Sequence, residues 1–162
     1  MAVLREGELQ ITLPPGISGR QFDGPGHGLS HCMKAVDWVI ELPDHIRFIE
    51  LKDPDAQRAA PHRHKDNFLT KNLTPDLVTK FRDSFLYEWA CHRMAKPIRY
   101  FVVIAAGSLD KAMLMERSDD LKRRLPSGNP QPWLRSIVQN CGVFSIETWN
   151  ASFPDWPLER IP

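Results

Sequence analysis

The chain has 162 residues, of which 42% are apolar and 25% charged, and its formal net charge is +1. This composition is typical of one soluble globular domain and excludes disordered, collagen-like and membrane-spanning chains. The near balance of 21 basic and 20 acidic residues also excludes an overall basic surface that coats nucleic acid, but it leaves room for a local basic groove. We therefore expect a single domain over residues 1–162.

Prolines and cysteines narrow the class further. Fourteen prolines argue against long helices and coiled coils, because an interior proline removes a helix hydrogen bond. Cys32, Cys91 and Cys141 are widely spaced and form no CxxC pair, which favours free thiols in a reducing cytoplasm. The longest uncharged apolar run, Tyr100 to Ala106, is too short to span a bilayer. We expect a cytoplasmic protein with no membrane contact.

The first half of the chain predicts strands. Residues 8–14 alternate weakly and indicate a first strand, and the glycines and prolines after it predict a long loop. Residues 35–42 and 46–52 are rich in β-branched and aromatic side chains. They are separated by Pro43, Asp44 and His45, which predicts a β-hairpin.

A second loop over residues 53–72 precedes the best helix signal. Thr74 is the expected N-cap and Pro75 the first helical residue, and the helix should end before Pro97. Its apolar face consists of residues at helical spacing: Leu77, Val78, Phe81, Phe85 and Trp89.

The rest of the chain predicts a buried strand, a helix and a last strand. Residues 98–106 form an apolar run typical of an interior strand. Ser108 is the expected cap of a helix that continues to Arg124, and residues 143–149 are the expected last strand. This order predicts an α/β (mixed α+β) fold in which a mixed sheet with a β-hairpin is flanked by helices.

The hairpin carries the most informative side chains. A turn centred on Pro43 and Asp44 would place Asp37 directly opposite Glu50. Because strand side chains alternate between faces, Glu50 and Lys52 would share the face of Asp37, while the apolar neighbours of Glu50 point to the other. Two opposed carboxylates repel each other, and a divalent cation such as Mg²⁺ or Mn²⁺ would relieve that repulsion.

An Asp followed by Glu-x-Lys on the next strand resembles the PD-(D/E)XK nuclease superfamily, with its restriction-endonuclease-like fold. The motif reads AVD at 35–37 and FIELKDP at 48–54. The segments LSHCMKAVDW and FRDSFLYEWA also look like those of small uncharacterised bacterial members. The resemblance implies a nuclease-like core over about residues 30–150, metal ligation by Asp37, Glu50 and the carbonyl of Leu51, and a catalytic Lys52.

Further site residues are expected around this motif. Many superfamily members carry an additional acid upstream, for which Glu6, Glu8 and Asp23 are the candidates here. Glu88 is expected either to pair with a neighbouring base or to reach the active site. His62 and His64 are a weaker candidate for a zinc site. Nucleic-acid phosphates are expected to contact basic residues of the 53–72 loop and the following helix: Arg58, Arg63, Lys65, Lys71, Lys80 and Arg82.

Three functional hypotheses follow. The first is a Mg²⁺-dependent (or Mn²⁺-dependent) nuclease that hydrolyses DNA, with RNA as the other polynucleotide substrate; the sequence leaves open whether it acts as a homodimer. The second is a catalytically inactive module that kept the nuclease fold for binding or assembly. The third is a metal-dependent hydrolase of another phosphoester.

Overall fold

The computed structural model describes residues 2–56 and 73–161. Its elements along the chain are β1 (Val3–Glu6), β2 (Leu9–Thr12), β3 (Ser18–Gln21), the 3₁₀ turn η1 (Pro25–His27), β4 (Trp38–Glu41), β5 (Ile46–Lys52), α2 (Leu73–Ala90), β6 (Ile98–Ile104), α3 (Lys111–Arg124), β7 (Val138–Phe144), α4 (Ile146–Ser152) and β8 (Leu158–Arg160). The fold is mixed α/β, as the sequence predicts.

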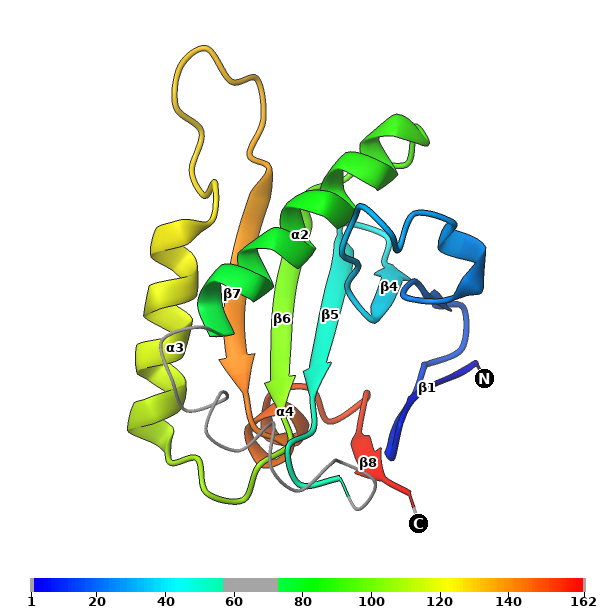
Figure 1. Ribbon diagram of the computed structural model, residues 1–162, viewed down its shortest axis with the longest axis vertical. Helices are drawn as coiled ribbons and strands as arrows, with labels where there is room; N and C mark the ends of the chain where they lie inside the picture. Colours follow the sequence, from blue (N-terminus) through cyan, green and yellow to red (C-terminus); the bar gives the residue numbers. More distant parts are fainter. Residues whose placement is uncertain (1, 57–72, 162) are drawn as a thin grey trace.

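A five-stranded mixed sheet forms the centre of the molecule, in the order β3-β4-β5-β6-β7. The first three strands are antiparallel, and β5, β6 and β7 run parallel. A smaller antiparallel sheet has the order β1-β2-β8. In Figure 1 helix α2 crosses in front of the parallel strands, and α3 runs alongside β7.

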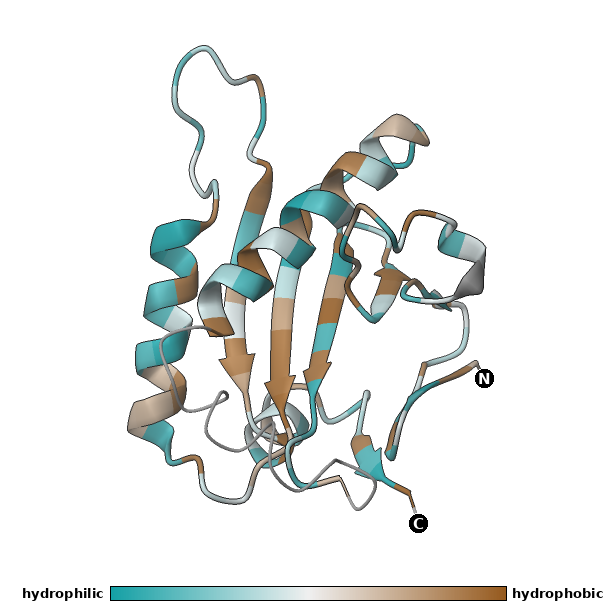
Figure 2. Cartoon of the chain, viewed as in Figure 1, coloured by the Kyte–Doolittle hydropathy of each residue, from teal (hydrophilic) through white to brown (hydrophobic). Residues whose placement is uncertain are grey.

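Apolar side chains cover both faces of the large sheet. Phe48, Tyr100 and Val102 pack with α2 and α3 in one core cluster, whereas Phe101 and Val103 pack with α4 and the small sheet in the other. Alternation along each strand separates the two clusters. Figure 2 shows hydrophobic residues prominent along β5, β6 and β7, as expected for parallel strands buried on both faces.

The predicted hairpin forms with the predicted register. Trp38 pairs with Ile49 and Glu41 pairs with Ile46, which matches a turn centred on residues 43 and 44. The expected strand over 35–42 is too long, however, because β4 begins at Trp38. The interior position expected for the strand at 98–106 is confirmed, since β6 lies between β5 and β7.

Several other boundaries differ from expectation. Thr74 lies inside α2 and not at its cap, and α3 is capped by Asp110, whose side chain accepts a hydrogen bond from the Met113 amide, and not by Ser108. The strand expected over 143–149 is wrong. There β7 ends at Phe144, because Ser145 forms a capping box with Thr148 and starts α4.

The expected loop before the hairpin is also wrong in part, since it contains β3, an edge strand paired with β4. On α2, Trp89 is 57% exposed and the buried face continues instead through Ser84 and Glu88. The three cysteines are free thiols. None of the helices in the described part of the chain is long and apolar enough to cross a membrane.

Candidate functional site

Asp37 and Glu50 meet on the sheet face that α2 covers. Continuing the observed β4–β5 register by one residue places Asp37, which directly precedes β4, opposite Glu50. Both residues are buried, with 5% and 0% of their surface exposed. The Asp37 carboxylate accepts a hydrogen bond from the Leu51 amide, with 2.6 Å between Oδ2 and N. The backbone of β5 therefore fixes the Asp37 carboxylate beside the Glu50 carboxylate.

Two lysines converge on Glu50. Nζ of Lys52 and Nζ of Lys80 each lie 2.7 Å from Glu50 Oε1. Among the described residues the second oxygen, Oε2, is buried with no hydrogen-bond partner. A fully buried carboxylate oxygen without a donor is costly. It is also a free ligand atom for a cation.

Burial and like charge act together on Asp37. Loss of hydration disfavours the carboxylate, and the adjacent Glu50 adds repulsion, so the pKa of Asp37 rises from 3.8 to about 8. Lys80 and the Leu51 amide oppose this rise. Asp37 is thus held largely as the neutral acid at neutral pH unless a further positive charge arrives.

Lys80 lies on the side of α2 that faces the sheet. Partial burial disfavours its ammonium form, but Glu50 and Asp37 outweigh burial and hold the pKa of Lys80 above its usual value. Of the two α2 cations predicted to bind phosphate, Lys80 lies in the site and Arg82 is exposed. Arg58, Arg63, Lys65 and Lys71, like His62 and His64, lie outside the described residues.

One polar stripe on α2 organises the whole region. Asp76, Lys80, Ser84 and Glu88 follow one another at four-residue intervals and so lie along the same side of the helix. Asp76 Oδ2 lies 3.8 Å from Lys52 Nζ, and its other oxygen accepts a hydrogen bond from Lys34. Burial opposes ionisation of Asp76, but these lysines hold its pKa below the usual value.

Ser84 positions the segment that leads into Asp37. Its hydroxyl oxygen accepts a hydrogen bond from the Val36 amide, with 3.0 Å between the two atoms. One residue earlier on the helix, Asp83 accepts a hydrogen bond of 2.8 Å from the Lys34 amide. This role of Ser84 was not predicted from the sequence. Its signal was a serine at helical spacing between Lys80 and Glu88.

Two of the three candidate upstream acids lie near the site. Burial and repulsion from Asp23 raise the pKa of Glu6, and Glu50 adds a smaller repulsion, whereas the hydrogen bond from Gln21 and the charge of Lys80 oppose the rise. The Gln21 side-chain amide donates to Glu6 across 3.1 Å, which holds the end of β1 against the end of β3. Glu8, in contrast, is bonded to Arg160 at 3.0 Å. Sequence spacing alone could not show which of these acids lies near the site, because β1 approaches the site only beside β3, the edge strand of the large sheet.

The residues present fit a small divalent cation. Within the described ranges no group of three or more His, Cys, Asp or Glu side chains is close enough to hold a metal alone. The fit rests instead on two buried carboxylates, one with an unpartnered oxygen. Mg²⁺ commonly binds through one or two carboxylates and completes its shell with water and substrate phosphate.

No protein-family model, no curated protein and no solved structure matches this chain.

Proposed function

We propose that this chain is a Mg²⁺-dependent nuclease of the PD-(D/E)XK type that hydrolyses phosphodiester bonds of DNA. The observation that carries the proposal is the buried pair Asp37 and Glu50, set opposite each other by the hairpin register, with two lysines in contact with Glu50. Such a pair is destabilising as an isolated structural feature. A buried arrangement that costs stability is expected where a site performs a function.

Asp37, Glu50 and the Leu51 carbonyl would hold the cation, which when bound lowers the pKa of water and polarises the scissile phosphate. Asp37 would release its proton on loading, since burial and repulsion from Glu50 raise its pKa and a bound cation would offset both. Leu51 would then contribute twice. Its carbonyl would bind the cation, and its amide already fixes the Asp37 carboxylate.

Lys52 would act on the phosphate. Its side chain is 16% exposed, so the ammonium lies at the boundary between the buried carboxylates and solvent. From there it can stabilise negative charge that develops as water attacks phosphorus and the bond to the leaving oxygen breaks. Lys80, 14% exposed, would keep Glu50 oriented when Lys52 turns toward substrate.

The test combines cleavage with metal binding. Fluorescent linear DNA and supercoiled plasmid are incubated with Mg²⁺, Mn²⁺ or EDTA, and Mn²⁺ binding is measured by calorimetry. We expect Lys52→Ala to abolish cleavage while it retains the fold and most Mn²⁺ affinity, and Asp37→Asn to lose both. Lys111→Ala, an exposed position on α3, is the matched control. Full Mg²⁺-dependent cleavage by Lys52→Ala would refute the assignment.

A second candidate is the inactive binding or assembly module. The observation that favours it is that two ammonium groups already compensate Glu50 at 2.7 Å, an arrangement that is stable without a cation. Calorimetry separates the two candidates. Absence of Mn²⁺ binding in the wild-type chain, or binding unaffected by Asp37→Asn, would favour the module.

A further inference from the structure

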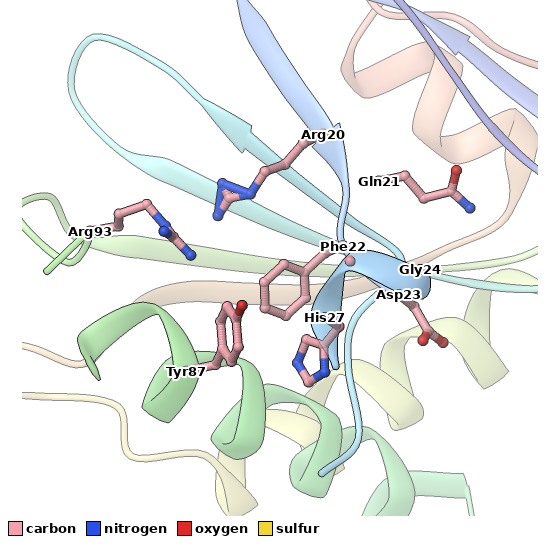
Figure 3. Close-up of a pocket in the computed structure, with 9 residues that line it drawn as sticks. Arg20, Gln21, Phe22, Asp23, Gly24, His27, Tyr87 and Arg93 are labelled. Atoms are coloured by element: carbon pink, nitrogen blue, oxygen red, sulfur yellow. The ribbon is translucent and has the colours of Figure 1, made fainter. Parts of the chain in front are cut away.

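A cavity of about 340 Å³ lies beside the candidate site, between β3, η1 and the end of α2. Figure 3 shows the guanidinium groups of Arg20 and Arg93 at one end and the rings of Phe22, His27 and Tyr87 beside them. Gln21 and Asp23 lie on the other side of Phe22 in the same view. The volume is at the lower end of the range of about 300 to 1,000 Å³ found for small-molecule sites.

The basic end of the cavity carries a surplus positive charge. Arg93 donates to both oxygens of Glu88, at 3.0 and 2.8 Å, and Arg20 donates to the same carboxylate. Glu88 is 1% exposed, whereas 35% of the Arg20 side chain and 38% of the Arg93 side chain remain exposed. One carboxylate therefore orients two guanidinium groups but neutralises only one, and leaves N–H donors facing solvent.

The aromatic wall has a polar atom with no partner. The rings of His27 and Tyr87 stack with centroids 4.5 Å apart, and Phe22 meets both edge-on at 5.2 and 5.3 Å. His27 is 92% buried, and within the described residues its Nε2 has no hydrogen-bond partner. A buried imidazole nitrogen without a partner is costly. A ligand with a hydrogen-bonding group in the cavity would relieve that cost.

The cavity is joined directly to the candidate site. The Phe22 amide donates to the Asp37 carbonyl across 2.7 Å, so the aromatic wall and the metal-ligand segment share one backbone hydrogen bond. Asp23, which lines the cavity, also lies close enough to Lys80 and Glu6 to shift the pKa of each. A strand whose scissile phosphate lay at Asp37 and Glu50 would therefore pass this cavity.

We propose that this cavity binds one nucleotide of the substrate strand, with its phosphate on Arg20 and Arg93 and its base against Tyr87. Arginine forks suit phosphate oxygens, and base–aromatic stacking is tolerant of sequence. The proposal rests on the proposed function for its substrate class. It gives the cavity a role in holding the nucleic-acid strand and no role in catalysis. It requires no metal.

The test measures binding and not cleavage. The full chain is titrated in EDTA into a fluorescent 12-nucleotide single-stranded DNA, and the dissociation constant is followed by anisotropy. We expect Tyr87→Leu to weaken binding by about 5- to 150-fold, the range given by loss of one stacked base. Tyr87→Phe, which keeps the ring, should bind like wild type. Trp89→Leu is the matched control, because Trp89 is an exposed aromatic side chain on the same helix outside the cavity.

A second variant tests the phosphate end independently of the aromatic wall. Arg93→Gln should lower the slope of log Kd against log salt by about 1, because one phosphate contact is lost. Thermal melts identify any variant that fails to fold. Wild-type affinity for both Tyr87→Leu and Arg93→Gln would overturn the proposal, as would equal weakening by Trp89→Leu.

Free dAMP distinguishes the source of the nucleotide. Competition by dAMP at concentrations near the oligonucleotide Kd would overturn the strand assignment and identify a free nucleotide as the ligand. Failure of the proposed function looks different. In that case the chain would show no Mg²⁺-dependent cleavage, while oligonucleotide binding in EDTA would still depend on Tyr87 and Arg93.

Discussion

Replacing Asp37 by Asn should change how stability depends on pH. In the unfolded chain this carboxyl titrates near 3.8, and in the folded chain burial and Glu50 raise its pKa to about 8. Between these values the folded state holds a proton that the unfolded state has lost, so the free energy of unfolding falls as pH rises. The penalty is absent below about pH 4 and is complete above about pH 8.

The size of the effect follows from one proton. Each pH unit within that window costs about 1.4 kcal/mol, so wild type should lose about 4 kcal/mol between pH 5 and pH 8 relative to Asp37→Asn. This is a large part of the usual stability of about 5 to 15 kcal/mol. The asparagine oxygen can still accept the hydrogen bond from Leu51, so the comparison isolates the charge.

Urea denaturation in EDTA at pH 5, 6, 7 and 8 measures this difference. The exposed Asp119→Asn variant on α3 serves as control and should follow wild type at every pH. If the stability gap between wild type and Asp37→Asn stays constant within about 1 kcal/mol over this range, the carboxyl is not held neutral by its surroundings. Burial and repulsion from Glu50 would then not be what sets the protonation state of Asp37.

Other predictions concern the cation and the supports of the site. At Mg²⁺ concentrations of 100 times Kd, wild type should gain about 2.7 kcal/mol of stability, measured by thermal melts, and Asp37→Asn should gain none. Ser84→Ala should cost about 1 to 3 kcal/mol in urea denaturation, because it leaves the buried Val36 amide without its acceptor; stability equal to wild type would contradict this role. Gly19→Ala should cost about 1 to 3 kcal/mol, since its Cβ would lie 2.7 Å from Leu13 Cδ1. Gly107→Ala, whose Cβ meets nothing within 4 Å, is the control, and an equal loss there would refute the packing argument.

The predicted register of the hairpin is confirmed because it depends on short-range information. A two-strand unit with a turn at Pro43 and Asp44 fixes which residues face each other, so the opposition of Asp37 and Glu50 could be worked out from numbering alone. The parallel strand β6 could also be predicted from the sequence, since a continuous apolar run bounded by a proline and a glycine is typical of a strand buried on both faces.

Elements whose stability comes from distant partners could not be predicted in this way. The residues of β3 have little strand propensity, and the strand forms because it pairs with β4 and packs Gly19 against the β1–β2 hairpin. β8 pairs with β2 from the other end of the chain. The start of α4 was predicted wrongly for a different reason. The Ser145 and Thr148 capping box was visible in the sequence, but the apolar run before it favoured a strand.

The α2 stripe explains why the candidate site extends beyond its three-residue motif. Asp76 reaches toward Lys52, Lys80 binds Glu50, Ser84 holds the approach to Asp37, and Glu88 orients the cavity arginines. Residues four apart on a helix are neighbours by helix geometry alone, so the stripe could be predicted from the sequence. The residues that it contacts could not be predicted, because they depend on how α2 crosses the sheet. Each group faces a different strand or loop, and a small rotation of α2 would disturb the candidate metal ligands and the cavity together. Substitutions in the stripe should therefore impair cation binding and oligonucleotide binding in parallel, whereas substitutions at Lys52 or Tyr87 should separate the two.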